Sequence, residues 1–97
     1  MKKIILFNEL KNNFAENKDK AKEIRENLLM PTIKDGEKVI LDFDKIESTT
    51  QSFIHALISD VIRRNGVEAI DKMYFSNCND TVKGIVTIVV NYMQRKE

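Results

Sequence analysis

Short apolar runs and charged segments alternate along the first third of the chain. Residues 3–7 are apolar and partly β-branched, a pattern that predicts a first strand. From Asn17 onward, apolar residues recur at helical spacing among charged side chains and predict a helix; they are Ala21, Ile24 and Leu28. This helix is expected to end at Met30, because the ring and missing N–H of Pro31 disrupt the helical hydrogen bonds.

A second strand and a second helix follow. Residues 34–37 carry a turn signal, and residues 38–43 form the short continuous apolar run of a strand covered on both faces. Residues 50–65 predict an amphipathic helix whose apolar stripe is formed by Phe53, Ile54, Leu57, Ile58, Val61 and Ile62. Gly66 is expected to close this helix, because glycine takes the left-handed terminal conformation most easily.

The last third begins with a third strand, predicted over residues 72–77. Residues 84–93 are rich in β-branched side chains, so a strand is one interpretation. A helix is the other, because Asn79 or Asp80 can cap a helix that starts near Thr81. We favour the helix, since it gathers one apolar face from Val82, Ile85, Val86, Val89 and Met93.

The resulting order is β, α, β, α, β, α, with loops short enough for a single domain over residues 1–97. Residues 1–17 form its N-terminal strand and loop. The fold class is therefore α/β, with a mixed or parallel sheet packed by about three helices and joined by right-handed crossovers.

Composition and charge narrow the function. The net charge is +1, and lysines are interspersed with acidic residues, which argues against a nucleic-acid partner. Cys78 and His55 are the only cysteine and histidine, so we expect no metal site and no disulfide within the chain. The sequence carries neither a phosphate-binding glycine loop nor a nucleophile–base pair, so we expect no cofactor and no enzymatic activity. No apolar stretch reaches membrane-spanning length, and a cytoplasmic location is expected.

The segment between the second strand and the second helix carries the candidate chemistry. It reads LDFDKIESTTQSFIHAL, residues 41–57, and contains a run of hydroxyl side chains. Thr49 or Thr50 is expected to cap the helix. Ser52 and Thr50 are the candidate phosphorylation sites, because a phosphate there lies at the positive end of the helix. The residues expected at a partner-binding surface are Asp44, Glu47, Ser48, Thr49, His55 and Asn77.

This pattern resembles the STAS domain of anti-anti-sigma factors, and more closely a bacterial STAS-like family of unknown function. The resemblance covers about residues 18–95 and rests on Leu41-Asp42-Phe43, the hydroxyl-rich turn 48–50, the pair Ser52-Phe53 and Asn77. It implies a STAS-like fold and a regulatory binding domain whose partner is a GHKL-type ATPase. Such an ATPase acts as a serine kinase and anti-sigma factor in partner-switching systems.

In the STAS domains of partner-switching systems, the phosphorylated serine belongs to an Asp-Ser-Ser-Gly tetrad at the start of the helix. The tetrad falls here on Thr50, Gln51, Ser52 and Phe53. Ser52 keeps the second serine, whereas Gln51 replaces the usual acceptor and Phe53 replaces the glycine.

Three alternatives remain open from the sequence. A protein-binding regulatory module is favoured by the resemblance, a small-ligand or nucleotide-binding domain is the second, and an interaction or immunity protein of a mobile element is the third. Ile88, Val90 and Tyr92 lie off the main face of the last helix, so two interpretations are open: contact with a partner or with a second copy in a homodimer, or contact with a second layer of the same core.

Overall fold

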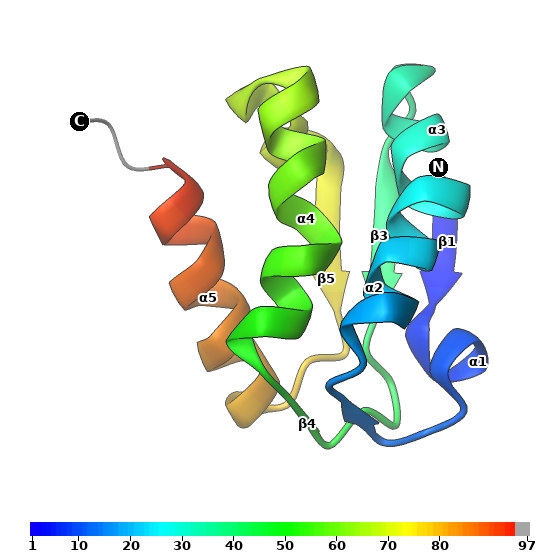
Figure 1. Ribbon diagram of the computed structural model, residues 1–97, viewed down its shortest axis with the longest axis vertical. Helices are drawn as coiled ribbons and strands as arrows, with labels where there is room; N and C mark the ends of the chain where they lie inside the picture. Colours follow the sequence, from blue (N-terminus) through cyan, green and yellow to red (C-terminus); the bar gives the residue numbers. More distant parts are fainter. Residues whose placement is uncertain (95–97) are drawn as a thin grey trace.

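Three strands lie side by side in one sheet, and helices connect them along the chain (Figure 1). The structure is a computed structural model that describes residues 1–94. The strands are β1 (Lys2–Ile5), β2 (Phe14–Ala15), β3 (Val39–Asp42), β4 (Ser48–Thr49) and β5 (Met73–Ser76). The helices are α1 (Leu6–Leu10), α2 (Lys18–Ile24), the π-helical turn η1 (Arg25–Leu29), α3 (Met30–Lys34), α4 (Gln51–Asn65), the 3₁₀ segment η2 (Val67–Lys72) and α5 (Asp80–Gln94).

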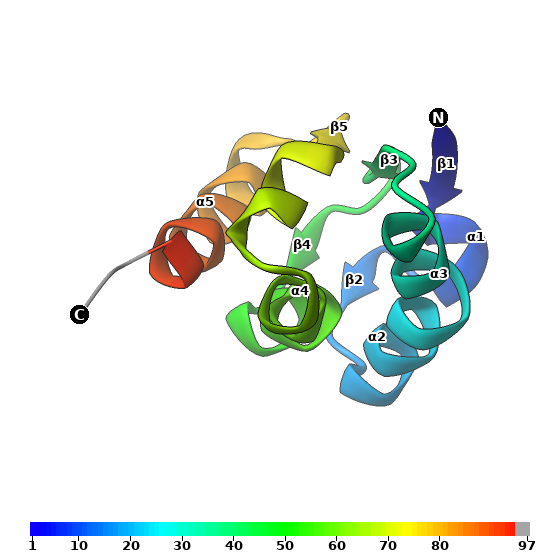
Figure 2. The same cartoon turned by 90° about the horizontal axis from the view of Figure 1, so that it is seen from above.

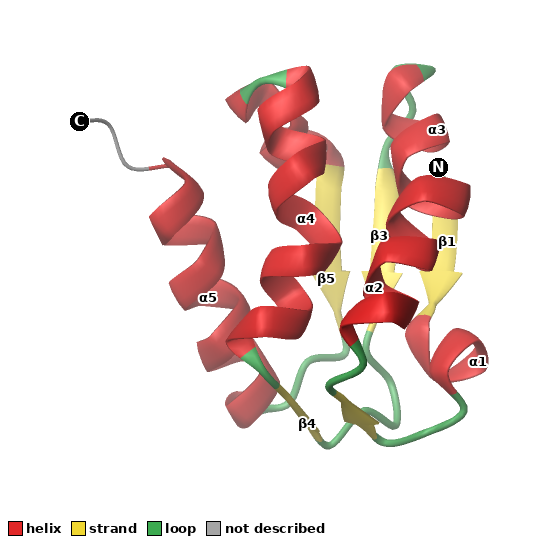
Figure 3. Ribbon diagram, in the orientation of Figure 1, coloured by secondary structure: helices red, strands yellow, loops and turns green. Residues whose placement is uncertain are grey.

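The main sheet has the order β1-β3-β5, and both strand pairs are parallel. Of the two arrangements predicted, mixed or parallel, the structure has the parallel one. In a second, small parallel sheet β2 pairs with β4 (Figure 3). This pairing fixes the position of the segment that leads into α4. The predicted α/β class is confirmed.

The helices α2, α3 and α4 lie on one side of the main sheet, as the view from above shows (Figure 2). On that side Ile4 pairs with Leu41, and Leu41 pairs with Phe75, so the three side chains form one row of the core. On the opposite face the corresponding row is Lys3, Ile40 and Tyr74. That face is not covered by any helix of residues 1–94. The prediction that 38–43 is covered on both faces was therefore wrong.

The core is centred on α4. Its predicted stripe is buried throughout, and Phe53, Ile54, Leu57, Ile58 and Val61 are fully enclosed. Each side chain of this size contributes about 1.5–3 kcal/mol when removed from water, so α4 is the main apolar contributor to folding. The position of α4 in turn fixes which of its residues remain accessible.

The first helix differs from the prediction at Pro31. The helix does not end at Met30 but continues as α3 to Lys34. The preceding turn is π-helical, and the Met30 N–H bonds the Arg25 carbonyl five residues back. Because this wider turn shifts the hydrogen-bonding pattern, Pro31 falls in a new first turn, where a missing N–H costs little.

The first strand is also shorter than predicted. Leu6 and Phe7 belong to α1, and Leu6 is fully buried there. An apolar run alone does not distinguish a strand from the first turn of a buried helix.

The last segment is the predicted helix. Asn79 is its cap, because its Oδ1 accepts the Val82 N–H at 2.8 Å and its carbonyl accepts the Lys83 N–H at 2.8 Å. Val82, Val86 and Val89 are buried, as expected from the apolar face. Within the described part of the chain, no helix is both long and apolar enough to cross a membrane.

Candidate functional site

The hydroxyl run divides into internal and accessible members at the start of α4. Thr50 is the cap, and its Oγ1 accepts the Phe53 N–H at 3.0 Å. Thr49 is buried, and its hydroxyl donates to the Ala15 carbonyl at 2.8 Å, which joins β4 to β2. Ser48 is half-buried in β4. Ser52, in the first turn of α4, is exposed.

Replacing Thr50 with alanine is expected to lower the free energy of unfolding by about 0.5–2 kcal/mol, because one N–H of the first turn loses its acceptor. Urea denaturation of the purified protein measures the loss. Thr50→Ser keeps the acceptor and is expected to retain most of the stability. An equal loss in both variants would mean that the Thr50 methyl group, and not the cap, is responsible.

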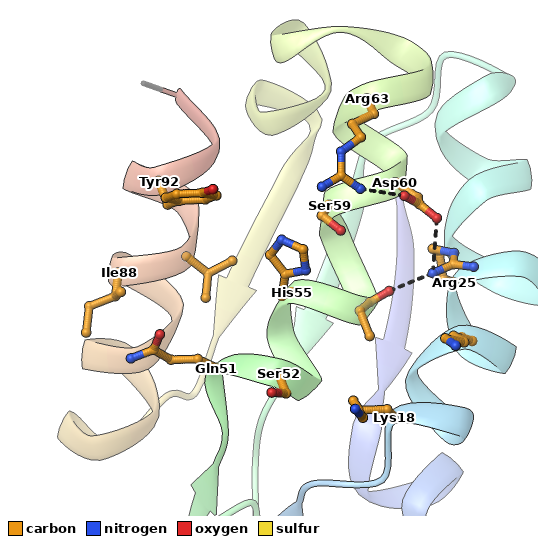
Figure 4. Close-up of a pocket in the computed structure, with 13 residues that line it drawn as sticks. Lys18, Arg25, Gln51, Ser52, His55, Ser59, Asp60, Arg63, Ile88 and Tyr92 are labelled. Carbon is orange, nitrogen blue, oxygen red and sulfur yellow. Dashed lines mark hydrogen bonds and ion pairs between the residues drawn. The ribbon is translucent and has the colours of Figure 1, made fainter. Parts of the chain in front are cut away.

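Ser52 and His55 line an open groove of about 630 Å³ that runs between α2 and α5 across α4 (Figure 4). We call it the α4 groove. Its cationic lining residues are Lys18, Lys22, Arg25 and Arg63. On the opposite side α5 contributes Ile88 and Tyr92, which are 51% and 60% exposed. The groove thus has a basic side and an apolar side, with hydroxyl and imidazole groups between them.

Arg25 is the one buried cation of this groove, and it joins η1 to α4. Its Nη1 donates to the Ala56 carbonyl at 2.9 Å and lies 3.5 Å from an Asp60 carboxylate oxygen. Its Nε donates to Glu26 at 2.7 Å. The hydrogen bond from Arg25, reinforced by Arg64 at 3.3 Å, holds the pKa of Glu26 below its usual value although desolvation opposes the shift. Arg25 therefore has a structural role.

Lys18 and Lys22 have no carboxylate within ion-pair distance in residues 1–94. Arg63 pairs with Asp60 at 2.8 Å but remains exposed. The cations of this groove were not among the site residues predicted from the sequence. Three of them could have been found from the sequence, because the spacing of Lys18, Lys22 and Arg25 places them on a common helical face.

A second group of predicted residues lies at the carboxyl ends of the strands, near Asn77. Asn77 has a left-handed backbone with φ +56°, and its Nδ2 donates to Asp42 at 2.9 Å. Asp42, only 4% exposed, also accepts the Asp44 N–H at 2.9 Å and lies 3.4 Å from the Lys3 ammonium. Burial raises the pKa of Asp42, but these three partners outweigh burial and hold the pKa below its usual value.

The lowered pKa of Asp42 makes its contribution to stability dependent on pH. A depressed carboxyl pKa stabilises the fold above the unfolded-state value of about 3.9, and this stabilisation is lost as the pH falls through the folded-state pKa. We expect the unfolding free energy to decrease below about pH 4, and to decrease less in Asp42→Asn. Urea denaturation between about pH 6 and pH 3 tests this. Identical pH profiles for both proteins would contradict it.

Asp44 and Glu47 are exposed and line another shallow groove that also includes Asn77. This groove does not share residues with the α4 groove. Of the six predicted partner residues, His55 therefore lines the α4 groove and three line the second groove, namely Asp44, Glu47 and Asn77. Ser48 and the buried Thr49 line neither.

The histidine and the cysteine lie in different grooves, His55 in the α4 groove and Cys78 beside β5. The His55 ring lies 6.4 Å from the Tyr92 ring, centroid to centroid. Burial raises the pKa of the Cys78 thiol, assisted by Asp42 and opposed by Lys83, and a raised pKa reduces nucleophilic reactivity. Within residues 1–94 no three His, Cys, Asp or Glu side chains are grouped so as to hold a metal ion.

Residues 20–83 match the family model described as a STAS-like domain of unknown function (DUF4325). No curated protein and no solved structure matches the chain significantly.

Proposed function

We propose that this chain, which belongs to the family of STAS-like domains of unknown function, is a non-catalytic regulatory module that binds another protein through α4 and the groove beside it. One observation carries the proposal. The α4 groove combines exposed cations with exposed apolar side chains along a single accessible channel. Such a combination is typical of surfaces that bind proteins, where apolar anchors supply affinity and charge supplies orientation.

The two sides of the groove indicate the chemistry of the partner. Lys18 and Lys22 favour carboxylates, whereas Ile88 and Tyr92 favour apolar side chains. A helix with acidic residues along one face and apolar residues along the other satisfies both sides at once. A GHKL-type ATPase that presents such a segment in a bacterial cytoplasm is the partner we propose, following the family resemblance.

Regulation by phosphorylation is compatible with this surface, and Ser52 is the better acceptor of the two candidates. Ser52 is exposed, whereas the Thr50 oxygen already accepts the Phe53 N–H. A phosphate on Ser52 adds about two negative charges in a groove that also contains Lys18 and Lys22. It would compete with partner carboxylates for these cations and so weaken binding.

The experiment begins with a photo-crosslinking amino acid at Gln51, an exposed residue of the groove, and at Lys34, an exposed residue outside it, in cells of the native host. A protein crosslinked from position 51 alone is then purified and its affinity measured. We expect the double variant Lys18→Glu, Lys22→Glu to bind at least about tenfold more weakly, and Lys34→Glu to bind normally. Unchanged affinity in the double variant, or crosslinking at both positions alike, would exclude the α4 groove as the binding surface.

A small anionic ligand such as a nucleotide is the second candidate, and the groove volume favours it. About 630 Å³ lies within the range of roughly 300–1,000 Å³ that small-molecule sites occupy. A rise in melting temperature with ATP or GTP that disappears in the same double variant would support it. Absence of any nucleotide response would leave the protein-binding role.

A further inference from the structure

The outer edge of β5 presents unpaired backbone groups. The Ser76 carbonyl accepts the Phe43 N–H at 2.9 Å, so Ser76 faces the β3 side of the sheet. In a parallel strand, alternate residues direct their N–H and C=O to opposite edges, and Phe75 and Met73 therefore face outward. The Met73 N–H bonds the Ile70 carbonyl, which agrees with this orientation. No strand within residues 1–94 pairs with the outer edge of β5 (Figure 1).

An apolar groove of about 480 Å³ lies beside this edge. We call it the edge groove. Its apolar lining comes from η2, β5 and α5 and includes Ile70, Met73, Phe75, Val86 and Val90. The Phe75 side chain points to the helix side of the sheet, as does Leu41 in the next strand. A strand added to β5 would direct every second side chain to that same side, and so into the edge groove.

The charge of the edge groove is positive at one end. Lys83 is the only charged residue that lines it, and it has no carboxylate within ion-pair distance in residues 1–94. It stands in the first turn of α5, where the helix dipole adds positive potential; Asp80 stands in the same turn but does not line the edge groove. This end also contains Asn77 and Cys78, which follow the carboxyl end of β5. A negative group is therefore favoured where an added parallel strand would end.

We propose that the edge of β5 binds an extended segment of a partner protein as an additional parallel strand. The segment has apolar side chains at alternate positions, which fill the edge groove, and a carboxylate at its C-terminal end, which pairs with Lys83. Outward N–H and C=O groups of Phe75 supply the backbone hydrogen bonds, while the groove and Lys83 supply the selectivity. This site is separate from the α4 groove, with which it shares no lining residue.

The test uses a library of random peptides displayed with free carboxyl ends and selected against the whole chain. We expect the selected peptides to alternate apolar and polar residues and to end in an acidic residue or in the terminal carboxylate itself. Their affinity is expected to fall at least about tenfold in Thr87→Trp, which fills the groove from an exposed position of α5, and in Lys83→Glu. Lys34→Glu, an exposed position outside both grooves, is the matched control and should bind normally.

A backbone readout distinguishes strand addition from adhesion to an apolar surface. The Phe75 amide is expected to exchange rapidly in the free protein and to be protected when a selected peptide is bound. An unprotected Phe75 amide, affinity that survives both groove variants, or a selection without a common pattern would overturn the proposal. Concentration-dependent self-association through β5, measured by ultracentrifugation and abolished by Thr87→Trp, would overturn it in favour of a second copy as the occupant.

Discussion

Replacing Arg25 with methionine is expected to lower the free energy of unfolding by about 2–3 kcal/mol. Methionine retains the length of the side chain and its packing but removes the guanidinium group. The contact with the Ala56 carbonyl at 2.9 Å is lost, and Asp60 loses the cation 3.5 Å away. Asp60 keeps Arg63 at 2.8 Å and Glu26 keeps Arg64 at 3.3 Å. The main source of the loss is therefore the Ala56 carbonyl, which loses its charged donor.

Urea denaturation of Arg25→Met at neutral pH measures this loss directly. Lys22→Met is the matched control, because Lys22 lies on the same helix but is exposed, and it should change stability by less than about 0.5 kcal/mol. In an Asp60→Asn background the cost of Arg25→Met is expected to be smaller, since the two residues share the contact. Equal stabilities of Arg25→Met and Lys22→Met would show that the network does not hold η1 to α4.

The elements that the sequence predicted well are those in which the capping residues and the pattern of apolar positions indicate the same element. The stripe of α4 has a clear helical period, and Thr50 and Gly66 mark its two ends. The β-branched residues of α5 were compatible with a strand or a helix. The capping residue Asn79 favoured the helix, because a side-chain cap is a local signal in the sequence. The family prediction was confirmed, and it drew on the same segments.

The errors have a different physical origin. A π-helical turn is not encoded in a hydrophobic period, so the continuation past Pro31 could not be inferred from that residue. Within residues 1–94, helices cover only one face of β3, and which face they cover depends on where they pack. An apolar run in the sequence does not contain that information. The α4 groove likewise brings together α2, α4 and α5, segments far apart in sequence. Its individual residues look ordinary, and only the fold gives them a common surface.

Phe53 shows how the core restricts the candidate site. The resemblance to anti-anti-sigma factors predicted a glycine at this position, whereas Phe53 is fully buried as the first core residue of α4. It directly follows Ser52, which is exposed. Anchoring by Phe53 therefore holds the accessible hydroxyl in place at the mouth of the groove. Phe53 thus has a packing role, while Ser52 beside it stays exposed.

Replacing Phe53 with alanine is accordingly expected to cost about 3–5 kcal/mol, because a large aromatic side chain is removed from a closed core. A domain of ordinary stability has about 5–15 kcal/mol in total, so the variant should remain folded only marginally. Thermal and urea denaturation measure the change, with Ser52→Ala as the neighbouring exposed control, expected within about 0.5 kcal/mol of the parent. A loss below about 1 kcal/mol would show that the core around α4 relaxes to fill the space. Because Phe53→Ala is expected to weaken folding itself, effects on partner binding should be assigned to the hydroxyl only through Ser52→Ala, which leaves the core intact.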